Sequence, residues 1–393
     1  MVLFLHNRYR TSGGEERTVE DLLWLVREHM GEPAELLTRD SAELGRAHAA
    51  VGLLRGGLAP TEVAQAVRLS GARVVHAHNL QPALGWRALA AARAAGARVV
   101  LHLHQYRLVC AIGVCFTRGA ECTRCHGRDT LPGVRLNCRG SVPEALAYGA
   151  SLALWQRRLV EQADAVIVPS RFARERLREL GAPLPWERVH VVPPPVRDPA
   201  AGEGSDVLMR SGSADGGTPA VGAYALVVAR LAPEKGVDVA IDACRLAGMA
   251  LVVAGDGPER AALERRAGAG GSGGAGGSGV RFVGRVDDLR LAELRAGAAL
   301  ALVPSRSAET FGLAAAEAMA CGLPVAASRV GALPELVEAD ALVAPGDAAA
   351  LAGAIARLAG DRAAGERARE RVRALCAPEV VARALADVYD AST

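Results

Sequence analysis

The stretch ALALVPSRSAETFGLAAAEAMACGLPVAAS, residues 299–328, contains the pattern from which the fold follows. The apolar run at 298–305 predicts a buried strand, the Ala-rich segment after it predicts a helix, and LPVAAS at 323–328 predicts the next strand. Gly322 and Pro324 mark the end of the helix. A strand, a helix and a second strand in this order predict two parallel strands joined by a crossover helix.

The same alternation extends in both directions along the chain, in two series. Continuous Val-rich strands separated by helices are typical of a parallel sheet with helices on both faces. We therefore expect an α/β protein with two doubly wound, Rossmann-like domains. The predicted strands of the first series are VLFLH near the start and 72–78, 97–104 and 163–170, with a helix at 16–29, and those that precede 298–305 in the second series are 224–230, 249–255 and 280–284.

The length and a change of composition predict the domain boundaries. A chain of 393 residues exceeds the ~100 to 200 residues of an ordinary domain. Past residue 197 the sequence becomes rich in Gly and polar residues, which predicts a linker at 198–219. The first domain is thus expected at 1–197 and the second at 220–377, with a cleft between them. The Gly-rich segment 266–279 is expected to be a mobile surface loop.

Composition excludes several classes of protein. Hydrophobic residues make up 50% and charged residues 23% of the chain, which favours packed interiors over disorder. The net charge is 46 − 43 = +3 with scattered basic residues, so nucleic acid is not expected as a partner. No apolar run predicts a signal peptide or a transmembrane helix, so we expect a cytoplasmic protein. Arg-bearing helices still allow peripheral contact with an anionic membrane.

Charged and glycine-rich loops follow the strands of the second series, where parallel sheets bind ligands. Arg230 and Lys235 flank a turn after strand 224–230, and both suit phosphate oxygens. Gly255 and Gly257 follow strand 249–255, where they permit close backbone approach. Solvated charges and an ordinary turn are the simpler alternatives for these two loops.

Glu309 and Glu317 lie just before and within the predicted helix after strand 298–305. Eight residues at ~1.5 Å per residue place them roughly 12 Å apart along a helix axis, too far to act on one bond. They suit opposite ends of an extended ligand such as a nucleotide sugar, with the amides of residues 310–312 available for the phosphates between. Two solvated glutamates on an Ala-rich helix are the alternative.

Histidines alternate in two strands of the first series. His76 and His78, like His102 and His104, are spaced so that each pair shares one face of its strand. The second member of each pair lies at the carboxyl end, which makes His78 and His104 the candidates for ligand contact. A metal cluster of all four is an alternative that lacks an acidic ligand, whereas core packing accounts for His76 and His102.

A glycine pair, Gly13-Gly14, lies between the first strand and the first helix. Without side chains, the backbone there has room to approach a ligand, although an ordinary tight turn explains the pair equally well.

Together these motifs resemble the GT4 family of retaining glycosyltransferases over nearly the whole chain. The resemblance implies a GT-B fold, in which two Rossmann-like domains face each other across a cleft. It also implies a UDP-, GDP- or ADP-linked sugar donor, a hydroxyl acceptor and no catalytic cofactor. A C-terminal helix at 378–393 would cross back to the first domain.

The resemblance further implies roles for individual residues. His104 and Glu309 would be catalytic, beside the transferred sugar, while Arg230 and Lys235 would hold the diphosphate and Glu317 the ribose. The first domain would bind the acceptor, with His78 and Asn79 as candidates. The donor-binding set is Gly13, Gly14, Arg230, Lys235, Gly255, Gly257, Val283, Arg285, Glu309, Thr310, Phe311, Gly312, Leu313 and Glu317.

A cysteine-containing loop is expected at 109–140. The run from HQYRLVC through Cys122-Thr-Arg-Cys125 to Cys138 resembles a GT4 subgroup found among polysaccharide and natural-product enzymes. The spacing C-x11-C-x2-C-x12-C predicts a structural zinc site on Cys110, Cys122, Cys125 and Cys138, since a polar loop of this length needs more than apolar burial to become ordered. His126 or Cys115 is an alternative ligand. Unliganded thiols, or a Cys122–Cys125 disulfide, remain alternatives.

Three other functions compete with the transferase. A GT-B relative such as a nucleotide-sugar epimerase would turn over the donor without an acceptor. A non-catalytic nucleotide-binding protein would be expected to lack several of the site residues, and none is missing. A redox or iron-sulfur protein built on the cysteines would show a visible absorption spectrum.

Overall fold

The computed structural model describes residues 1–9, 13–197, 222, 224–268 and 279–391, and it divides into two compact units. The first unit contains residues 1–117, 121–195 and 378–393, and the second contains 118–120 and 196–377. The linker predicted at 198–219 lies outside the described residues, as does most of the loop predicted at 266–279.

A sheet of six parallel strands forms the centre of the first unit, in the order β2-β1-β3-β4-β7-β8. Chain direction across the sheet reverses between β1 and β3, which is the switch point of a doubly wound fold. The strands are β1 (Val2–Arg8), β2 (Ala34–Asp40), β3 (Val74–Ala77), β4 (Arg98–His102), β7 (Ala165–Val168) and β8 (Val189–Val191).

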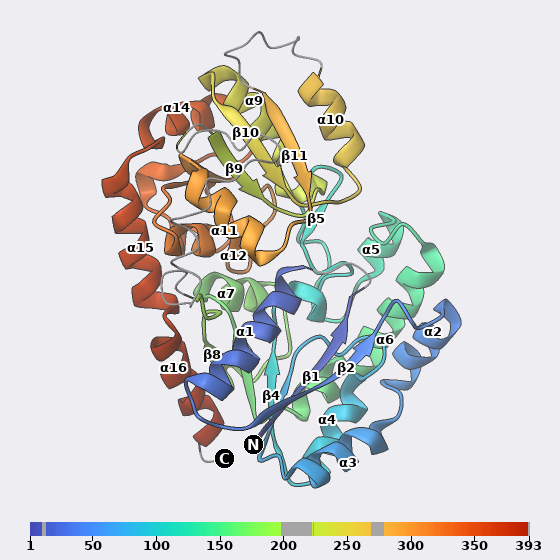
Figure 1. The fold of residues 1–393 in the computed structure, drawn as a ribbon. Helices are drawn as coiled ribbons and strands as arrows, with labels where there is room; N and C mark the ends of the chain where they lie inside the picture. The colour runs from blue at the N-terminus through green and yellow to red at the C-terminus, as the bar shows by residue number, and fades with distance from the viewer. Residues whose placement is uncertain (10–12, 198–221, 223, 269–278, 392–393) are drawn as a thin grey trace. The chain divides into compact units, whose positions relative to one another are not determined.

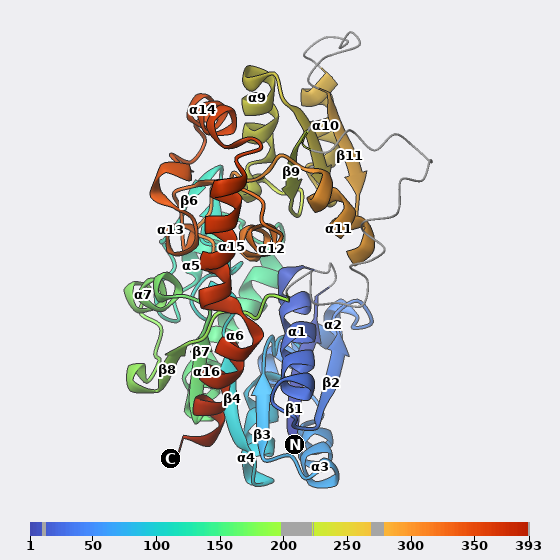
Figure 2. The same cartoon turned by 60° about the vertical axis from the view of Figure 1, so that its left-hand side comes forward.

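Helices cover both faces of this sheet (Figures 1 and 2). α1 and α16 pack on one face, and α4, flanked by α3 and α6, packs on the other. The apolar side of α16 reaches the core through Val381, Leu385 and Tyr389. The helices of the unit are α1 (Gly14–Glu28), α2 (Arg46–Arg55), α3 (Pro60–Ser70), α4 (Gly85–Ala94), α5 (Leu131–Arg135), α6 (Val142–Glu161), α7 (Arg171–Glu179) and α16 (Pro378–Asp390).

The second unit repeats the architecture with the strand order β11-β10-β9-β12-β13-β14, again all parallel. Here the switch point lies between β9 and β12. The strands are β9 (Tyr224–Val228), β10 (Ala250–Ala254), β11 (Val280–Gly284), β12 (Leu300–Val303), β13 (Val325–Ser328) and β14 (Leu342–Val343), and the helices are α9 (Val237–Ala247), α10 (Arg260–Gly268), α11 (Asp288–Gly297), α12 (Leu313–Ala320), α13 (Leu333–Leu336), α14 (Ala348–Leu358) and α15 (Arg362–Cys376).

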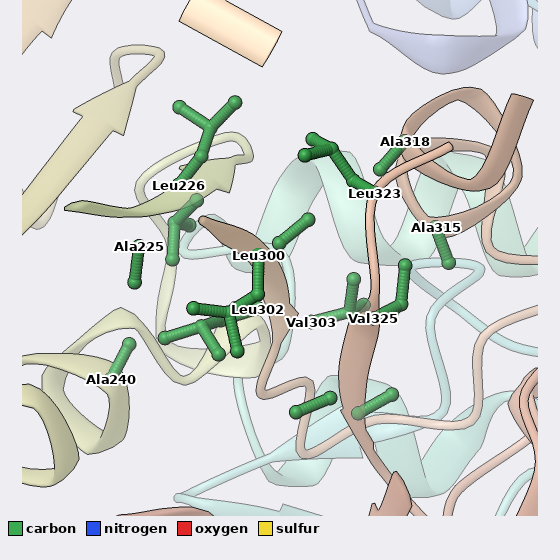
Figure 3. Close-up of a cluster of buried hydrophobic side chains, with 14 of the residues drawn as sticks. Ala225, Leu226, Ala240, Leu300, Leu302, Val303, Ala315, Ala318, Leu323 and Val325 are labelled. Carbon is green, nitrogen blue, oxygen red and sulfur yellow. The ribbon is translucent and has the colours of Figure 1, made fainter. Parts of the chain in front are cut away.

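Small side chains bring the helices of the second unit close to its sheet. Ala225 on β9, Ala240 on α9 and Ala315 on α12 are fully buried, and they alternate with larger residues such as Leu300 and Leu302 (Figure 3). Such a combination of large and small residues lets the helices pack closely on the sheet. The elements that carry the loops at the carboxyl edge of the sheet therefore have a closely packed base.

Short elements complete the two units. The cysteine-containing loop includes a hairpin and a short helix, and single 3₁₀ turns connect several strands and helices. These elements are β5 (Phe116–Thr117), β6 (Ala120–Glu121), η1 (Tyr106–Leu108), η2 (Trp186–Arg188), η3 (Pro233–Lys235) and η4 (Ala339–Ala341).

One glycine at a strand end requires the absence of a side chain. Gly255, after β10, has a φ of +137°, and a Cβ at this position would lie 1.9 Å from the carbonyl oxygen of Ala229. Its amide also donates to the carbonyl of Gly284, 2.7 Å away. Gly255 thus joins the ends of three neighbouring strands through backbone contacts alone.

We predict that Gly255→Ala lowers the free energy of unfolding by more than about 3 kcal/mol, because strain at positive φ adds to a backbone clash. Gly248→Ala is the matched control, since Gly248 also has a positive φ of +65° but nothing within 4 Å of the added Cβ. It should cost only about 1 kcal/mol. Urea titrations followed by circular dichroism compare the two, and equal midpoints would contradict the packing argument.

Candidate functional site

Loops from four strands gather at the carboxyl edge of the second sheet. β10, β9 and β12 are adjacent, and β11 pairs with β10. Arg230 and Lys235 follow β9, and Gly255 and Gly257 follow β10. Arg285 follows β11, and Glu309 follows β12. Because the sheet is parallel, all four loops leave it at the same edge. Most of the donor-binding residues implied by the resemblance are thus brought together.

The carboxylate of Glu309 is the centre of this edge. Its Oε1 accepts a hydrogen bond from Lys235 Nζ at 2.6 Å and another from Ser305 Oγ at 2.6 Å. Burial acts to raise the pKa of Glu309, but the Lys235 charge and these hydrogen bonds outweigh it, and the pKa is lowered. Glu309 is therefore ionised at neutral pH.

Lys235 is the only lysine in the sequence, where Lys and Arg together number 46. A chain with 45 arginines has an ammonium group at this one position, opposite a partly buried carboxylate. An ammonium is a compact point charge, unlike the planar guanidinium fork. This compositional signal was available in the sequence and identifies Lys235 more sharply than its loop position does.

The loop that carries Arg230 and Lys235 is held by contacts with the loop after β12. Glu234 is buried, pairs with Arg230, and accepts backbone N–H bonds from Arg306 (2.8 Å) and Ser307 (3.3 Å) through its carbonyl. Arg306 in turn donates both arms of its guanidinium to Asp238, at 2.8 and 2.6 Å. The two loops after β9 and β12 are thereby held in register, a contact that sequence spacing alone did not indicate.

Glu317 lies in α12 and pairs with Arg295 of α11. Arg295 is buried, with about 9% of the residue exposed, and its charge is neutralised by this carboxylate. The two residues are 22 positions apart. Sequence reasoning missed Arg295, because nothing in a helix-borne arginine shows which helix it will face.

The structure corrects the expected start of the helix after β12. α12 begins at Leu313 with Gly312 as its N-cap, and Gly312 has a φ of +102°. Thr310 and Phe311 therefore lie in the loop before the cap, so their amides are not those of the helix N-terminus. The first amides of the helix are instead those of Leu313 and Ala314, where the positive end of the helix dipole favours an anion.

Val283 and Arg285 lie at the end of β11. Val283 is half-buried and Arg285 is exposed, on either side of Gly284. The carbonyl of Gly284 accepts the Gly255 amide. The structure thus places both residues at the same edge as the glycine loop.

A stack of histidines lies in the first unit on the face of β3 and β4. His76 Nε2 bonds His102 Nδ1 at 3.2 Å, and His78 Nδ1 bonds His104 Nε2 at 2.7 Å. His76 Nδ1 also bonds the Tyr389 hydroxyl of α16 at 2.7 Å. The alternation in the sequence predicted shared faces, and the structure adds that the two strands bring both pairs into one stack.

Burial keeps the stack neutral. It lowers the pKa of His76 to about 3, and electrostatic repulsion from His104, were both rings protonated, lowers it further. Burial lowers the pKa of His104 to about 3 as well, with a further contribution from His6. His104 at the carboxyl end is thus an uncharged hydrogen-bonding group, which sequence reasoning could not specify.

Three of these histidines approach as metal ligands do, but their geometry does not suit an ion. Within the described part of the chain, His76, His78 and His102 have ligand atoms within 4.8 Å of one another. Their rings are stacked, with interplanar angles of 9° to 31°. Lone pairs in nearly parallel ring planes do not converge on one point. We interpret the three as packed core residues.

The remaining candidates of the first unit are engaged in local structure. The Gly13 amide donates to Glu16 Oε2 at 2.8 Å as part of a capping box for α1, which begins at Gly14. Asn79 is buried, and its Nδ2 donates to the carbonyls of Asn7 (2.6 Å) and Gln81 (3.2 Å). The side chain of Asn79 therefore shapes the turn after β3.

A polar cluster near His104 was missed by sequence reasoning. Glu15 is buried and accepts hydrogen bonds from the Tyr9 hydroxyl (2.8 Å) and from Gln105 Nε2 (3.1 Å). Burial raises the pKa of Glu15. The Arg107 guanidinium stacks on the Tyr9 ring at 4.5 Å. These residues come from α1 and from the segments just after β1 and β4, so only the fold joins them.

The cysteine-containing loop brings five thiols to one small cavity. Cys110, Cys115, Cys122, Cys125 and Cys138 all line it. A hydrogen bond with the Cys115 thiol lowers the pKa of Cys110 to about 6, and the same contact raises the pKa of Cys115. All eight cysteines are free, so the alternative disulfide between Cys122 and Cys125 does not form.

The zinc site predicted on Cys110, Cys122, Cys125 and Cys138 is not supported. Zn–S bonds of about 2.3 Å around one tetrahedral ion place thiolates roughly 4 Å apart. Among the described residues, which include the whole loop, no three cysteine sulfurs come within 4.8 Å of one another. The sequence spacing indicated proximity correctly, but it could not specify how the sulfurs are oriented.

Two family models match the chain. Residues 13–195 match the glycosyl transferase 4-like domain, and residues 222–361 match glycosyl transferases group 1.

Curated relatives match parts of the chain. It is 34% identical over 222 residues to the D-inositol 3-phosphate glycosyltransferase of Acidothermus cellulolyticus, an alignment that covers 51% of this chain and 48% of that protein. It is 44% identical over 117 residues, 28% of each chain, to the GDP-mannose-dependent alpha-(1-6)-phosphatidylinositol dimannoside mannosyltransferase of Mycobacterium tuberculosis. The chain thus spans about half the length of these relatives, or less.

Solved structures match over the full length. Anabaena HepE in complex with UDP and glucose has a TM-score of 0.63 at 20% identity and covers 100% of this chain and 99% of its own. Sucrose-phosphate synthase from Thermosynechococcus elongatus has a TM-score of 0.65 at 20% identity, with 99% and 98% covered. Together with the two parallel α/β units, these likenesses define the GT-B fold of glycosyltransferases. Within that class, the chain belongs to the GT4 family.

None of the described helices combines the length and the apolar character that crossing a membrane requires.

We predict that the neutral histidine stack makes the first unit sensitive to mild acid. Unfolded histidine takes up a proton below about pH 6.5, whereas the folded pKa of His76 and His104 is about 3. The unfolded state therefore binds more protons between these values, and stability that is full above about pH 6.5 falls as the pH decreases toward 3. The urea midpoint should be lower at about pH 5 than at about pH 7.5.

Two variants test the origin of this effect. His102→Phe removes one stacked imidazole and should make the pH dependence shallower. His48→Gln, at an exposed position of α2 outside the stack, should leave it unchanged. A midpoint that is constant or higher at the lower pH would contradict the neutral stack.

Proposed function

We propose that this protein is a retaining glycosyltransferase that moves a sugar from a nucleotide-diphosphate donor to a hydroxyl acceptor. The observation that carries the proposal is the Lys235–Glu309 pair, a single lysine bonded to an ionised carboxylate at the carboxyl edge of the second sheet. Family membership supports the activity, and the complexes of Anabaena HepE with UDP and with UDP-glucose support the donor class. The second unit would bind the donor and the first the acceptor.

The diphosphate would lie against Arg230, Lys235 and the N-terminus of α12. Both cations are paired with carboxylates in the free protein, Arg230 with Glu234 and Lys235 with Glu309. A diphosphate can share these cations without leaving either carboxylate unpaired, since each cation has several donors. They would neutralise the leaving group, which is the task that a divalent metal performs in other transferases. Gly255 and Gly257 would shape the adjacent loop.

The nucleoside would extend from the diphosphate toward Glu317. The carboxylate of Glu317 is oriented by Arg295, so one of its oxygens can accept from ribose hydroxyls while the other keeps its ion pair. Backbone at Val283 to Arg285 would frame the base.

Glu309 and His104 would act at the transferred sugar. Because the pKa of Glu309 is lowered, its carboxylate is an acceptor for sugar hydroxyls and a counter-charge for developing positive charge, and it is not a general acid. His104 is neutral and offers an imidazole hydrogen bond. For retention, the acceptor hydroxyl would attack the face from which the diphosphate leaves, and a diphosphate oxygen would take the hydroxyl proton. His78 would support His104 through their 2.7 Å bond.

We predict that Lys235→Ala weakens binding of UDP or GDP by about 1.5 to 3 kcal/mol, because a charge-assisted contact is lost. Lys235→Arg should restore part of the affinity but little of the turnover, since a planar fork replaces a point charge. Isothermal titration calorimetry measures the first effect and a donor-turnover assay the second. Unchanged affinity in Lys235→Ala would remove Lys235 from the site.

The single lysine allows an independent test on the unmodified protein. An amine-reactive ester can label only Lys235 and the terminal amine, and peptide mass spectrometry separates the two sites. Bound nucleoside diphosphate should slow labelling of Lys235 and leave the terminal amine unaffected. Equal labelling with and without saturating nucleotide would argue against contact.

We predict that Glu309→Gln and His104→Ala reduce kcat by at least about 100-fold while changing nucleotide affinity less than about three-fold, because both residues would face the sugar. Single-turnover kinetics and calorimetry separate the two quantities. Glu317→Gln is the matched comparison, and it should mainly weaken nucleotide binding. Full turnover in Glu309→Gln or His104→Ala would withdraw the catalytic role of that residue.

A further inference from the structure

Exposed large hydrophobic side chains gather on one part of the first unit. Six of the ten that the described residues leave exposed belong to α2, α5 and α6, which lie next to one another. In Figure 1 these helices are labelled on the same side of the first unit. The six are Val51, Leu54, Leu131, Val142, Leu146 and Leu154.

The packing of α2 against α6 explains why these side chains stay outside. The two helices bury Leu53, Tyr148 and Leu152 in a small cluster of their own. Trp155 Nε1 also donates to the carbonyl of Leu54 at 3.0 Å, which joins the two helices at this point. With the inner positions filled, Leu54 on α2 and Leu154 on α6 are left 47% and 55% exposed.

The exposed positions recur with helical spacing. On α6, Leu146 lies four residues after Val142 and Leu154 eight residues after Leu146, which spreads the three over about 120° of one side of the helix. On α2, Val51 and Leu54 are three apart and share a face. Each helix therefore carries apolar side chains on its exposed side as well as on the side that packs against its neighbour.

The charges around this apolar surface are mostly positive, and the acidic residues of these two helices, Glu144 and Glu161, lie at the two ends of α6. α2 begins at Arg46 and ends at Arg55, and α6 carries Arg157 and Arg158 near its end. No acidic residue occurs in α2, and none occurs in α6 between Ala145 and Val160. The acidic residue in the first turn of α6, Glu144, is neutralised by Arg139 at 2.6 Å.

Two arginines of this surface lack a carboxylate partner among the described residues, unlike two arginines of α7. Arg176 and Arg178 on α7 each pair with a glutamate. Arg55 and Arg157 form no ion pair with any carboxylate in the described part of the chain. Unpaired guanidinium groups beside exposed leucines attract a partner that is both anionic and apolar.

We propose that the α2–α6 surface, defined by Val51, Leu54, Leu146, Leu154, Arg55 and Arg157, binds the surface of an anionic phospholipid bilayer. The leucines would enter the acyl boundary while the arginines pair with headgroup phosphates. Trp155, between the two helices, suits the polar–apolar interface. The binding is peripheral and involves residues outside the donor site, so it stands independently of the transferase proposal.

Sedimentation with sucrose-loaded vesicles tests this surface on the full chain. Vesicles of phosphatidylglycerol mixed with phosphatidylcholine should pellet the protein, and pure phosphatidylcholine should pellet much less. Arg55→Gln with Arg157→Gln should lower partitioning about 30-fold, since each surface arginine contributes about five-fold. Leu54→Ser with Leu146→Ser should lower it at least about ten-fold. Added salt should weaken binding of the wild-type protein.

A matched control comes from α3 of the same unit. Arg68→Gln with Leu69→Ser changes an exposed arginine and a leucine that is 80% exposed, and it should keep wild-type partitioning. Circular dichroism confirms that each variant is folded, and nucleotide affinity should stay at the wild-type value in all of them. Equal sedimentation of the wild-type protein with and without anionic vesicles overturns the proposal. A dimer in light scattering that Leu54→Ser with Leu146→Ser dissociates would assign the surface to a second copy and overturn it too.

Discussion

Glu309 joins three loops of the second unit through its carboxylate and its backbone carbonyl. Lys235, after β9, and Ser305, after β12, both donate to its Oε1. The turn after β13 packs on its backbone, where the Ala332 amide donates to the Glu309 carbonyl at 2.9 Å. A Cβ on Gly331 would lie 2.3 Å from the same carbonyl oxygen, so this approach depends on glycine. A partly buried carboxylate is costly unless it is paired and hydrogen-bonded, and the arrangement of these loops satisfies that requirement.

Three cations at this edge are paired with carboxylates before any ligand binds. The three ion pairs are neutral as pairs, so they repel one another little in the free protein. They are Arg230 with Glu234, Lys235 with Glu309 and Arg295 with Glu317. The backbone is held separately, through the Glu234 carbonyl and the Arg306–Asp238 pair. A diphosphate would therefore meet cations already in position, and little loop ordering would oppose its binding. Such preorganisation is the condition under which charged groups contribute most to catalysis.

The sequence predicted most of the fold because most strands are short, strongly apolar and buried on both faces. The run at 249–255, for example, corresponds to β10 at Ala250–Ala254. β2 was missed because Ala34–Asp40 is an edge strand that is mostly half-exposed and contains Glu35, Arg39 and Asp40. Loop positions after strands were also predictable, since topology alone places them at one edge. Pairings such as Arg295 with Glu317, and the orientation of the five cysteine sulfurs, depend on side-chain geometry that spacing does not encode.

The chain has one lysine and 45 arginines, which indicates that position 235 requires an ammonium group and not a guanidinium. Lys235 lies beside Gly236, where a Cβ would come within 2.1 Å of the Pro304 carbonyl oxygen, so the two loops touch at this point. The ammonium group reaches a single carboxylate oxygen at 2.6 Å, whereas a guanidinium binds best with two parallel hydrogen bonds in one plane. Oε1 of Glu309 already accepts a hydrogen bond from Ser305, so a guanidinium would have to compete with Ser305 for one of the two carboxylate oxygens. A compact charge with three freely rotating donors can keep Glu309 and still turn toward a phosphate oxygen. The ion pair that stabilises the loops in the free protein can thus also serve the ligand.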